Sequence, residues 1–176
     1  MPCQLWVGAS VEFIAPAEIA TAASRTMGTI LGTDEDFDIQ AIEDDGSQGS
    51  PARATYGIDS RPYLLFRERR SEVFARVWGT RGPEVVEIQP ERWPQFCVDV
   101  TSSAMGALVA ASVAIELGRV LGSSIEDSET RFTEQLDVSP ETLIERIRLV
   151  TNDVVSLEDR IVCFARQLNV PGAFVA

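Results

Sequence analysis

The chain lacks two residue types that much enzyme chemistry requires. It contains no histidine, and no lysine occurs either, so all 15 basic residues are arginines. Without histidine, the most common general base and metal ligand is missing. Without lysine, a P-loop, a Schiff base and a serine–lysine dyad are excluded. Only carboxylates, cysteine, tyrosine and arginine remain for chemistry, so we expect this protein not to be an enzyme.

Cysteine is scarce and scattered. Cys3, Cys97 and Cys163 are far apart in the sequence and form no CxxC pair. An odd number without close spacing favours neither a disulfide framework nor a zinc site. Cys97 and Cys163 stand among apolar residues, so we expect them to be small buried hydrophobic side chains.

Long hydrophobic runs and a signal-peptide pattern are also missing. The longest uncharged run, between Asp99 and Glu116, has 16 residues, fewer than the roughly 20 that span a bilayer. The first residues show neither a basic segment nor an apolar one. A length of 176 residues suits one domain with a single core. We therefore expect a single-domain cytoplasmic protein with no membrane partner.

Negative charge is abundant and concentrated. The net charge is −12, and seven of the twelve residues from Asp34 to Asp45 are acidic. A phosphate backbone would be repelled, because nucleic-acid binding depends on basic side chains that displace counterions. A basic protein partner would be attracted, and its association would be accelerated. The charge therefore argues against nucleic acid and for a basic protein.

Hydrophobic periodicity and turn residues predict alternating strands and helices. Proline after an apolar strand, serine caps and glycine stops mark the helix ends. The composition of 44–55 indicates a loop. Strands are expected at 4–13, 37–43, 63–68, 73–78, 84–89, 95–101 and 124–127, and helices at 16–31, 103–121, 139–149 and 156–168.

These elements indicate an α+β fold, in which a mixed, mainly antiparallel sheet carries helices on one face. Two βαβ-like halves, residues 4–43 and 95–127, flank a central meander. Whether the halves reflect a duplication or only a common arrangement stays open. If the two halves pair in one sheet, one possible arrangement brings the two acidic regions, 34–45 and 126–145, to the same edge.

The acidic run has the opening spacing of a calcium loop. Asp34, Asp36 and Asp38 alternate as in an EF-hand, but Ile39 replaces the required glycine and Asp45 the final glutamate. We expect no metal site and no cofactor, although weak binding of a divalent cation stays open. The simplest alternative is a solvated acidic face.

Aromatic and arginine residues in the middle of the chain are the other candidates for contact. Trp78 alternates in phase with Phe74 and Arg76, and a tryptophan beside arginine is typical of interface hot spots. Packing in the core is the alternative for this tryptophan. The arginines at 67, 69 and 70 suit an acidic partner or a charged turn that protects a sheet edge.

One part of the chain resembles a known group of proteins. The stretch FCVDVTSSAMGALVAASVAIELGRVLGSSIEDSE, residues 96–129, joins a strand, an alanine-rich helix, a stop of small residues and an Ile-x-Asp segment. With SPETLIERIRL, residues 139–149, it resembles bacterial immunity proteins of polymorphic-toxin systems. The resemblance implies an inhibitor that occludes the active site of a cognate toxin, such as a nuclease or a nucleotide-modifying enzyme. These families share no binding signature, so no residue role is transferred.

The charge and the aromatic residues together predict the surface that binds the toxin. Acids would pair with its basic residues, and a tryptophan would anchor the contact. The candidate partner-binding residues are Asp34, Glu35, Asp36, Asp38, Glu43, Asp44, Asp45, Trp78, Glu126 and Asp127. Two alternatives remain: a regulatory or self-associating subunit, which predicts a dimer, and a small carboxylate-dependent enzyme, which predicts a deep pocket.

Overall fold

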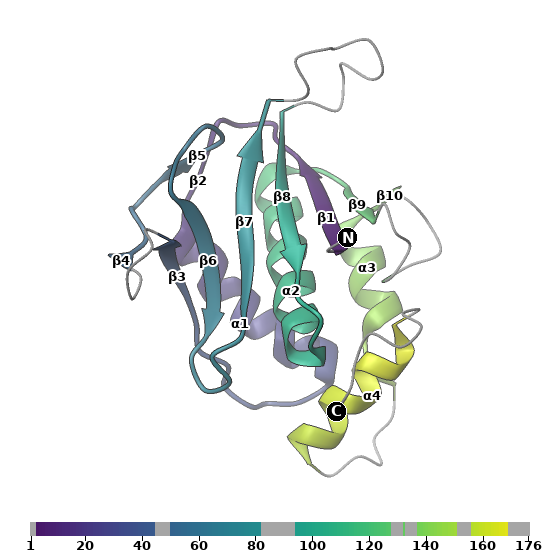
Figure 1. Ribbon diagram of the computed structural model, residues 1–176. Helices are drawn as coiled ribbons and strands as arrows, with labels where there is room; N and C mark the ends of the chain where they lie inside the picture. The colour runs from purple at the N-terminus through teal and green to yellow at the C-terminus, as the bar shows by residue number, and fades with distance from the viewer. Residues whose placement is uncertain are drawn as a thin grey trace.

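The computed structural model describes residues 3–44, 50–81, 94–127, 132, 137–150 and 156–168. Figure 1 labels the helices and strands that these residues form. The helices are α1 (Pro16–Leu31), α2 (Ala104–Leu121), α3 (Pro140–Ile147) and α4 (Leu157–Gln167). The strands are β1 (Cys3–Gly8), β2 (Phe13–Ile14), β3 (Ile39–Asp44), β4 (Ser50–Pro51), β5 (Tyr56–Gly57), β6 (Tyr63–Glu68), β7 (Phe74–Thr80), β8 (Gln95–Val100), β9 (Ile125–Asp127) and β10 (Asp137–Val138).

Most of the described strands form one sheet, in the order β10-β9-β1-β8-β7-β6-β3-β4. Every pairing between described strands is antiparallel. The described helices lie on one face of this sheet, which we call the inner face, and Figure 1 shows α1 and α2 behind β6, β7 and β8. The α+β class and the placement of helices on one face are confirmed.

The two βαβ-like halves do not lie side by side. Neighbouring strands of the sheet alternate in direction. In the first half, β1 runs parallel to β3, but three strands (β8, β7 and β6) lie between them. In the second half, β8 runs parallel to β9, and β1 lies between them. β3 and β9 therefore stand near opposite edges of the sheet. Both halves belong to one sheet, but the possible arrangement in which the two acidic regions share an edge is wrong, since four strands separate β3 from β9.

Local signals for helix ends are confirmed. Pro16 begins α1, and Gly32 ends it with a left-handed φ of 61°, a conformation that glycine adopts without strain. The Ser103 side chain accepts a hydrogen bond from the Gly106 backbone nitrogen at 3.0 Å and begins α2. Ser139 and Ser156 accept equivalent bonds at the start of α3 and α4. The polar caps occupy backbone donors that a helix start leaves without partners.

Helix α2 forms the centre of the core. It packs against β1, β6, β7 and β8 on one side and against α1, α3 and α4 on the other. Its length and mean hydropathy of 1.7 would suit a membrane span, but 78% of that segment is buried inside the protein. Burial on nearly all sides accounts for its apolar composition.

Some strand boundaries differ from the predictions. The expected strand 4–13 divides into β1, which ends at Gly8, and β2, which pairs with β5 in a separate small sheet. After Gly8 the chain leaves the large sheet, and the Ser10 hydroxyl in this segment donates a hydrogen bond to the Leu121 carbonyl at the end of α2. The acidic strand begins at Ile39 rather than 37, and Asp44 belongs to it. The predicted strand 84–89 lies outside the described residues.

Candidate protein-binding surface

The acidic loop between α1 and β3 lies against the arginine-rich turn between β6 and β7. Asp38 pairs with Arg69 at 3.2 Å, and Glu35 lies 3.7 Å from Arg70. The Arg69 backbone nitrogen also donates to the Asp38 carbonyl at 3.0 Å. The two charge clusters found in the sequence therefore face each other. Part of the acidic charge is compensated within the protein, and only Asp34 and Asp36 of this loop remain exposed without an ion pair given by the structure.

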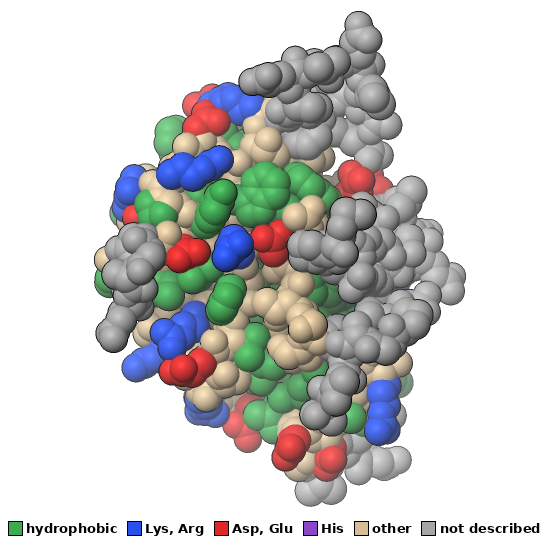
Figure 2. All heavy atoms as spheres, viewed as in Figure 1, with side chains coloured by type: hydrophobic (Ala, Val, Ile, Leu, Met, Phe, Trp, Pro, Cys, Tyr) green, Lys and Arg blue, Asp and Glu red, His purple; other side chains and the backbone are tan. Residues whose placement is uncertain are grey.

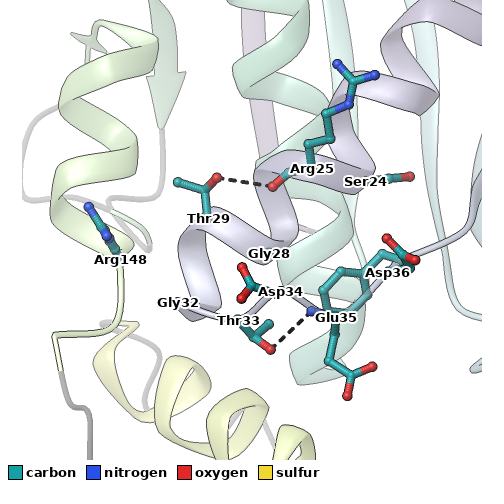
Figure 3. Close-up of a pocket in the computed structure, with 11 residues that line it drawn as sticks. Ser24, Arg25, Gly28, Thr29, Gly32, Thr33, Asp34, Glu35, Asp36 and Arg148 are labelled. Carbon is teal, nitrogen blue, oxygen red and sulfur yellow. Dashed lines mark hydrogen bonds between the residues drawn. The ribbon is translucent and has the colours of Figure 1, made fainter.

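An open hollow of about 500 Å³ lies beside this loop, at the end of α1. Figure 3 shows Arg148 across the hollow from the acidic loop, while the Thr33 hydroxyl accepts a hydrogen bond from the Glu35 nitrogen at 3.3 Å. Gly28 permits this turn, because a Cβ there would stand 2.9 Å from the Thr33 carbonyl oxygen. Most of the lining residues are polar or charged, and Phe37 is the apolar side chain among them. Among the described residues, no group of three or more His, Cys, Asp or Glu is arranged to hold a metal ion.

Four carboxylates of the described chain are buried, and each has a structural contact. Glu43, 8% exposed, accepts from the Arg53 side chain at 3.0 Å. Asp127, fully buried, accepts from the Phe132 nitrogen at 2.7 Å. Glu116 accepts from Thr26 and Arg119 and links α1 to α2. Glu43 and Asp127 were candidate contact residues, and their burial removes them from any surface that we propose.

Glu68, the fourth, sits at the end of β6 and is 1% exposed. Burial alone would raise the pKa of Glu68. Hydrogen bonds from the Ser71 hydroxyl and backbone nitrogen, both at 2.7 Å, and from neighbouring backbone groups outweigh it and lower the pKa below the ordinary 4.5. A buried general acid needs the opposite shift. Glu68 is therefore a carboxylate whose hydrogen bonds from Ser71 hold the arginine-rich turn in place.

The sheet face directed away from the helices, here called the outer face, carries the remaining candidates. No described helix covers it, and Figure 2 shows hydrophobic, basic and acidic side chains mixed over β6, β7 and β8. Cross-strand register places its residues in rows. One row is Asp137, Glu126, Trp6, Cys97 and Trp78, and the next is Gln4, Asp99, Arg76, Leu65, Ile42 and Pro51.

Trp6 and Trp78 form the centre of the outer face. They stand on β1 and β7, on either side of Cys97 in β8. Their ring centroids lie 5.5 Å apart with an interplanar angle of 78°, an edge-to-face geometry. Neighbouring strands are about 4.8 Å apart, so the two indoles lean toward each other over β8. Cys97 is fully buried beneath them.

Asp99 holds this pair in place from the adjacent row. Its carboxylate accepts hydrogen bonds from the Gln4 amide at 2.9 Å and from the Trp78 indole N–H at 3.5 Å. The Cys97 thiol lies 3.9 Å from the same oxygen. These donors are all neutral, so they orient the carboxylate without cancelling its charge.

Arg76, on the same strand as Trp78, contacts residues of β3 and β6 on the outer face. It lies 3.7 Å from the Asp44 carboxylate on β3, and its guanidinium stands 5.6 Å from the Tyr63 ring centre. Arg61 approaches the same ring at 5.3 Å. The Arg76 Nε atom is buried without a hydrogen-bond partner. Tyr63 on β6 and Phe74 on β7 are the exposed aromatic residues on this side of the outer face.

The structure therefore divides the candidate residues into three groups. Trp78, Asp44 and Glu126 belong to the outer face, Asp34, Glu35, Asp36 and Asp38 to the acidic loop, and Glu43 and Asp127 to the interior. Asp45 lies outside the described residues. Sequence reasoning missed Asp99 and Leu65, and it named Tyr63 only as an aromatic residue of the type found at interfaces. Grouping Asp99 and Leu65 with Arg76 requires the pairing order of the strands in addition to strand alternation.

Comparisons with models of known families, with curated proteins and with solved structures found no match.

Proposed function

We propose that this protein is a non-catalytic inhibitor that binds a basic partner protein and occludes that partner's active site, as immunity proteins neutralise toxins. The observation that carries the proposal is the outer face of the sheet. It presents Trp6, Trp78, Tyr63 and Phe74 together with Arg76, and no described helix covers it. Tryptophan, tyrosine and arginine are the residues most enriched at the energetic centres of interfaces.

Rigidity of this face favours binding. The contact side chains project from paired strands, and Asp99 and Arg76 fix two of the aromatic rings. Side chains that are ordered before association lose little conformational entropy on binding. The net charge of −12 favours a basic partner and speeds its approach. The proposal places the protein in the cytoplasm, with no nucleic-acid or membrane partner.

Covalent capture tests the proposal. A photo-crosslinking residue replaces Leu65 on the outer face in one variant and Thr21, which is exposed on α1, in a matched control. In lysate of the cells that encode this protein, the Leu65 variant should capture one protein that the Thr21 variant does not. The captured protein, once purified, should lose its activity on addition of one equivalent of the wild-type inhibitor.

Two results would overturn the proposal. Equal capture from both positions would remove the outer face as the contact surface. A captured protein whose activity is unchanged by excess of this chain would exclude inhibition. If the Leu65 variant crosslinks only to a second copy of this chain, the self-associating subunit replaces the inhibitor.

A further inference from the structure

The C-terminal end of α1 has four backbone carbonyls, at 28–31, that find no partner inside the helix. Residues directly after the helix satisfy two of them. The Thr33 nitrogen donates to the Gly28 carbonyl at 3.0 Å. The Gly32 nitrogen donates to the Thr29 carbonyl at 3.3 Å, which completes a Schellman motif. The last two carbonyls of the helix need donors from other parts of the chain.

Two donors from distant parts of the chain reach these carbonyls. The Leu149 nitrogen, just after α3, donates to the Ile30 carbonyl at 2.8 Å. The Arg160 guanidinium, on α4, donates to the Leu31 carbonyl at 2.8 Å. Ile30 and Leu31 are fully buried, so neither carbonyl could bind water instead, and a lost donor would leave a buried acceptor unsatisfied. The positive charge of Arg160 also suits the negative end of the helix dipole.

The helix that carries Arg160 is held by few apolar side chains. α4, yellow in Figure 1, packs against α1 and α2. Phe164 is the one buried residue of α4, and Leu168 is buried directly after it, whereas most of α2 is buried. Elements that bury little apolar surface open at a lower free energy than the core of a protein. We therefore expect α4 to detach before the sheet and α2 unfold.

We infer that α4 is a detachable latch for the acidic loop, with Arg160 as the residue that connects them. When α4 detaches, the Leu31 carbonyl loses its donor, the end of α1 weakens, and the loop that follows Gly32 loses order with it. The coupling is reciprocal, so an interaction that orders the acidic loop also favours the docked state of α4. This device goes beyond the proposed inhibition and does not depend on it.

Residue-resolved hydrogen exchange, measured by NMR, tests the coupling from the side of α4. Arg160→Met keeps an apolar stem and removes the donor, whereas Arg25→Met removes an exposed guanidinium from the middle of α1 as a matched control. Arg160→Met should accelerate exchange at least about fivefold in α4 and at the amides of Thr33 and Leu149. Arg25→Met should change these rates by less than about twofold. Exchange in α2 should be unchanged in both variants.

A pair of glycine variants tests the coupling from the side of α1. Gly32 and Gly122 each end a helix with a left-handed φ, of 61° and 60°, so alanine strains the backbone equally at both. At Gly32 the new Cβ would stand 3.6 Å from the Arg160 guanidinium, whereas at Gly122 it would meet nothing within 4 Å. Gly32→Ala should accelerate exchange in α4 severalfold, and Gly122→Ala should leave it unchanged. Circular dichroism confirms that each variant is folded.

Three results would overturn the inference. If α4 exchanges as slowly as α2 in the wild-type protein, the helix does not detach on its own. If Arg160→Met accelerates exchange in α4 but not at Thr33 and Leu149, the arginine holds α4 without coupling it to the loop. Equal effects of Gly32→Ala and Gly122→Ala on α4 would show that the end of α1 does not control the latch.

Discussion

Trp6 and Trp78 come from strands that are not neighbours, yet their rings meet at 5.5 Å above Cys97 on the strand between them. This contact joins residues that are 72 positions apart in the chain, since 78 − 6 = 72. It covers the middle of a sheet face that the described helices leave open, and it supplies the aromatic centre of the proposed interface.

The first prediction concerns the cover over Cys97. In a background with Cys3→Ser and Cys163→Ser, Cys97 should react slowly with a thiol reagent, because it is fully buried. Trp78→Ala should raise the rate of labelling at least severalfold and lower the free energy of unfolding by about 1–3 kcal/mol. Labelling followed by mass spectrometry and urea unfolding measure the two effects. An unchanged labelling rate would show that other atoms cover the thiol.

The second prediction concerns Glu68 and pH. Its pKa is lowered in the folded protein, so its contribution to stability is present above the unfolded pKa and is lost as pH falls through the lowered folded pKa. Glu68→Gln should therefore lower stability at neutral pH and flatten the loss of stability below about pH 4.5.

Ser71→Ala tests whether the hydrogen bonds from Ser71 are what lowers the pKa of Glu68. It removes the hydroxyl donor and leaves the burial, so the Glu68 pKa should rise relative to the wild-type protein. NMR titration of the Glu68 side chain measures the change. A wild-type pKa at or above the ordinary range would contradict this account of the turn.

The third prediction concerns the contact between the acidic loop and the arginine-rich turn. Arg69→Ala and Arg70→Ala should each cost about 0–1 kcal/mol, because both ion pairs are exposed. The loss should shrink in high salt, which screens surface charges. Urea unfolding at low and high ionic strength measures it. A large, salt-independent loss in either variant would show that the arginine acts through packing instead.

The fourth prediction compares two glycines of the sheet. A Cβ on Gly79 would stand 2.2 Å from the Ile58 carbonyl oxygen, whereas one on Gly8 would meet the movable Ser123 hydroxyl at 2.7 Å. Gly79→Ala should lower the free energy of unfolding by about 3 kcal/mol, and Gly8→Ala by about 1 kcal/mol or less. Equal losses would contradict the close approach of β7 to the chain after β5.

Local signals in the sequence were sufficient to predict where the helices α1 and α2 begin and end. Pro16, Ser103, Gly32 and Gly122 act within one turn of the chain, so the ends of α1 and α2 follow from a few residues. Strand order does not follow in this way. It depends on pairings such as β1 with β8, whose residues are far apart in sequence, and alternation says only which residues share a face.

The same limit applies to the candidate site. The acidic run and the arginine-rich turn were evident in the sequence, but their contact through Asp38 and Arg69 depends on β3 pairing with β6. Glu43 falls on the inner face because it is the register neighbour of Leu64. Burial of Asp127 likewise follows from its pairing with Leu5 on β1. A sequence shows how many charged residues a protein has, whereas the fold decides which of their side chains are buried and which face solvent.

The most direct test of the central claim measures how the captured partner binds two charge-matched variants. Leu65→Arg places a cation in the middle of the outer face, and Thr21→Arg places the same charge on α1. We predict that Leu65→Arg weakens partner binding at least about tenfold and abolishes stoichiometric inhibition, while Thr21→Arg binds as the wild-type protein does. Equal affinity of both variants would show that the outer face of the sheet is not the inhibitory surface.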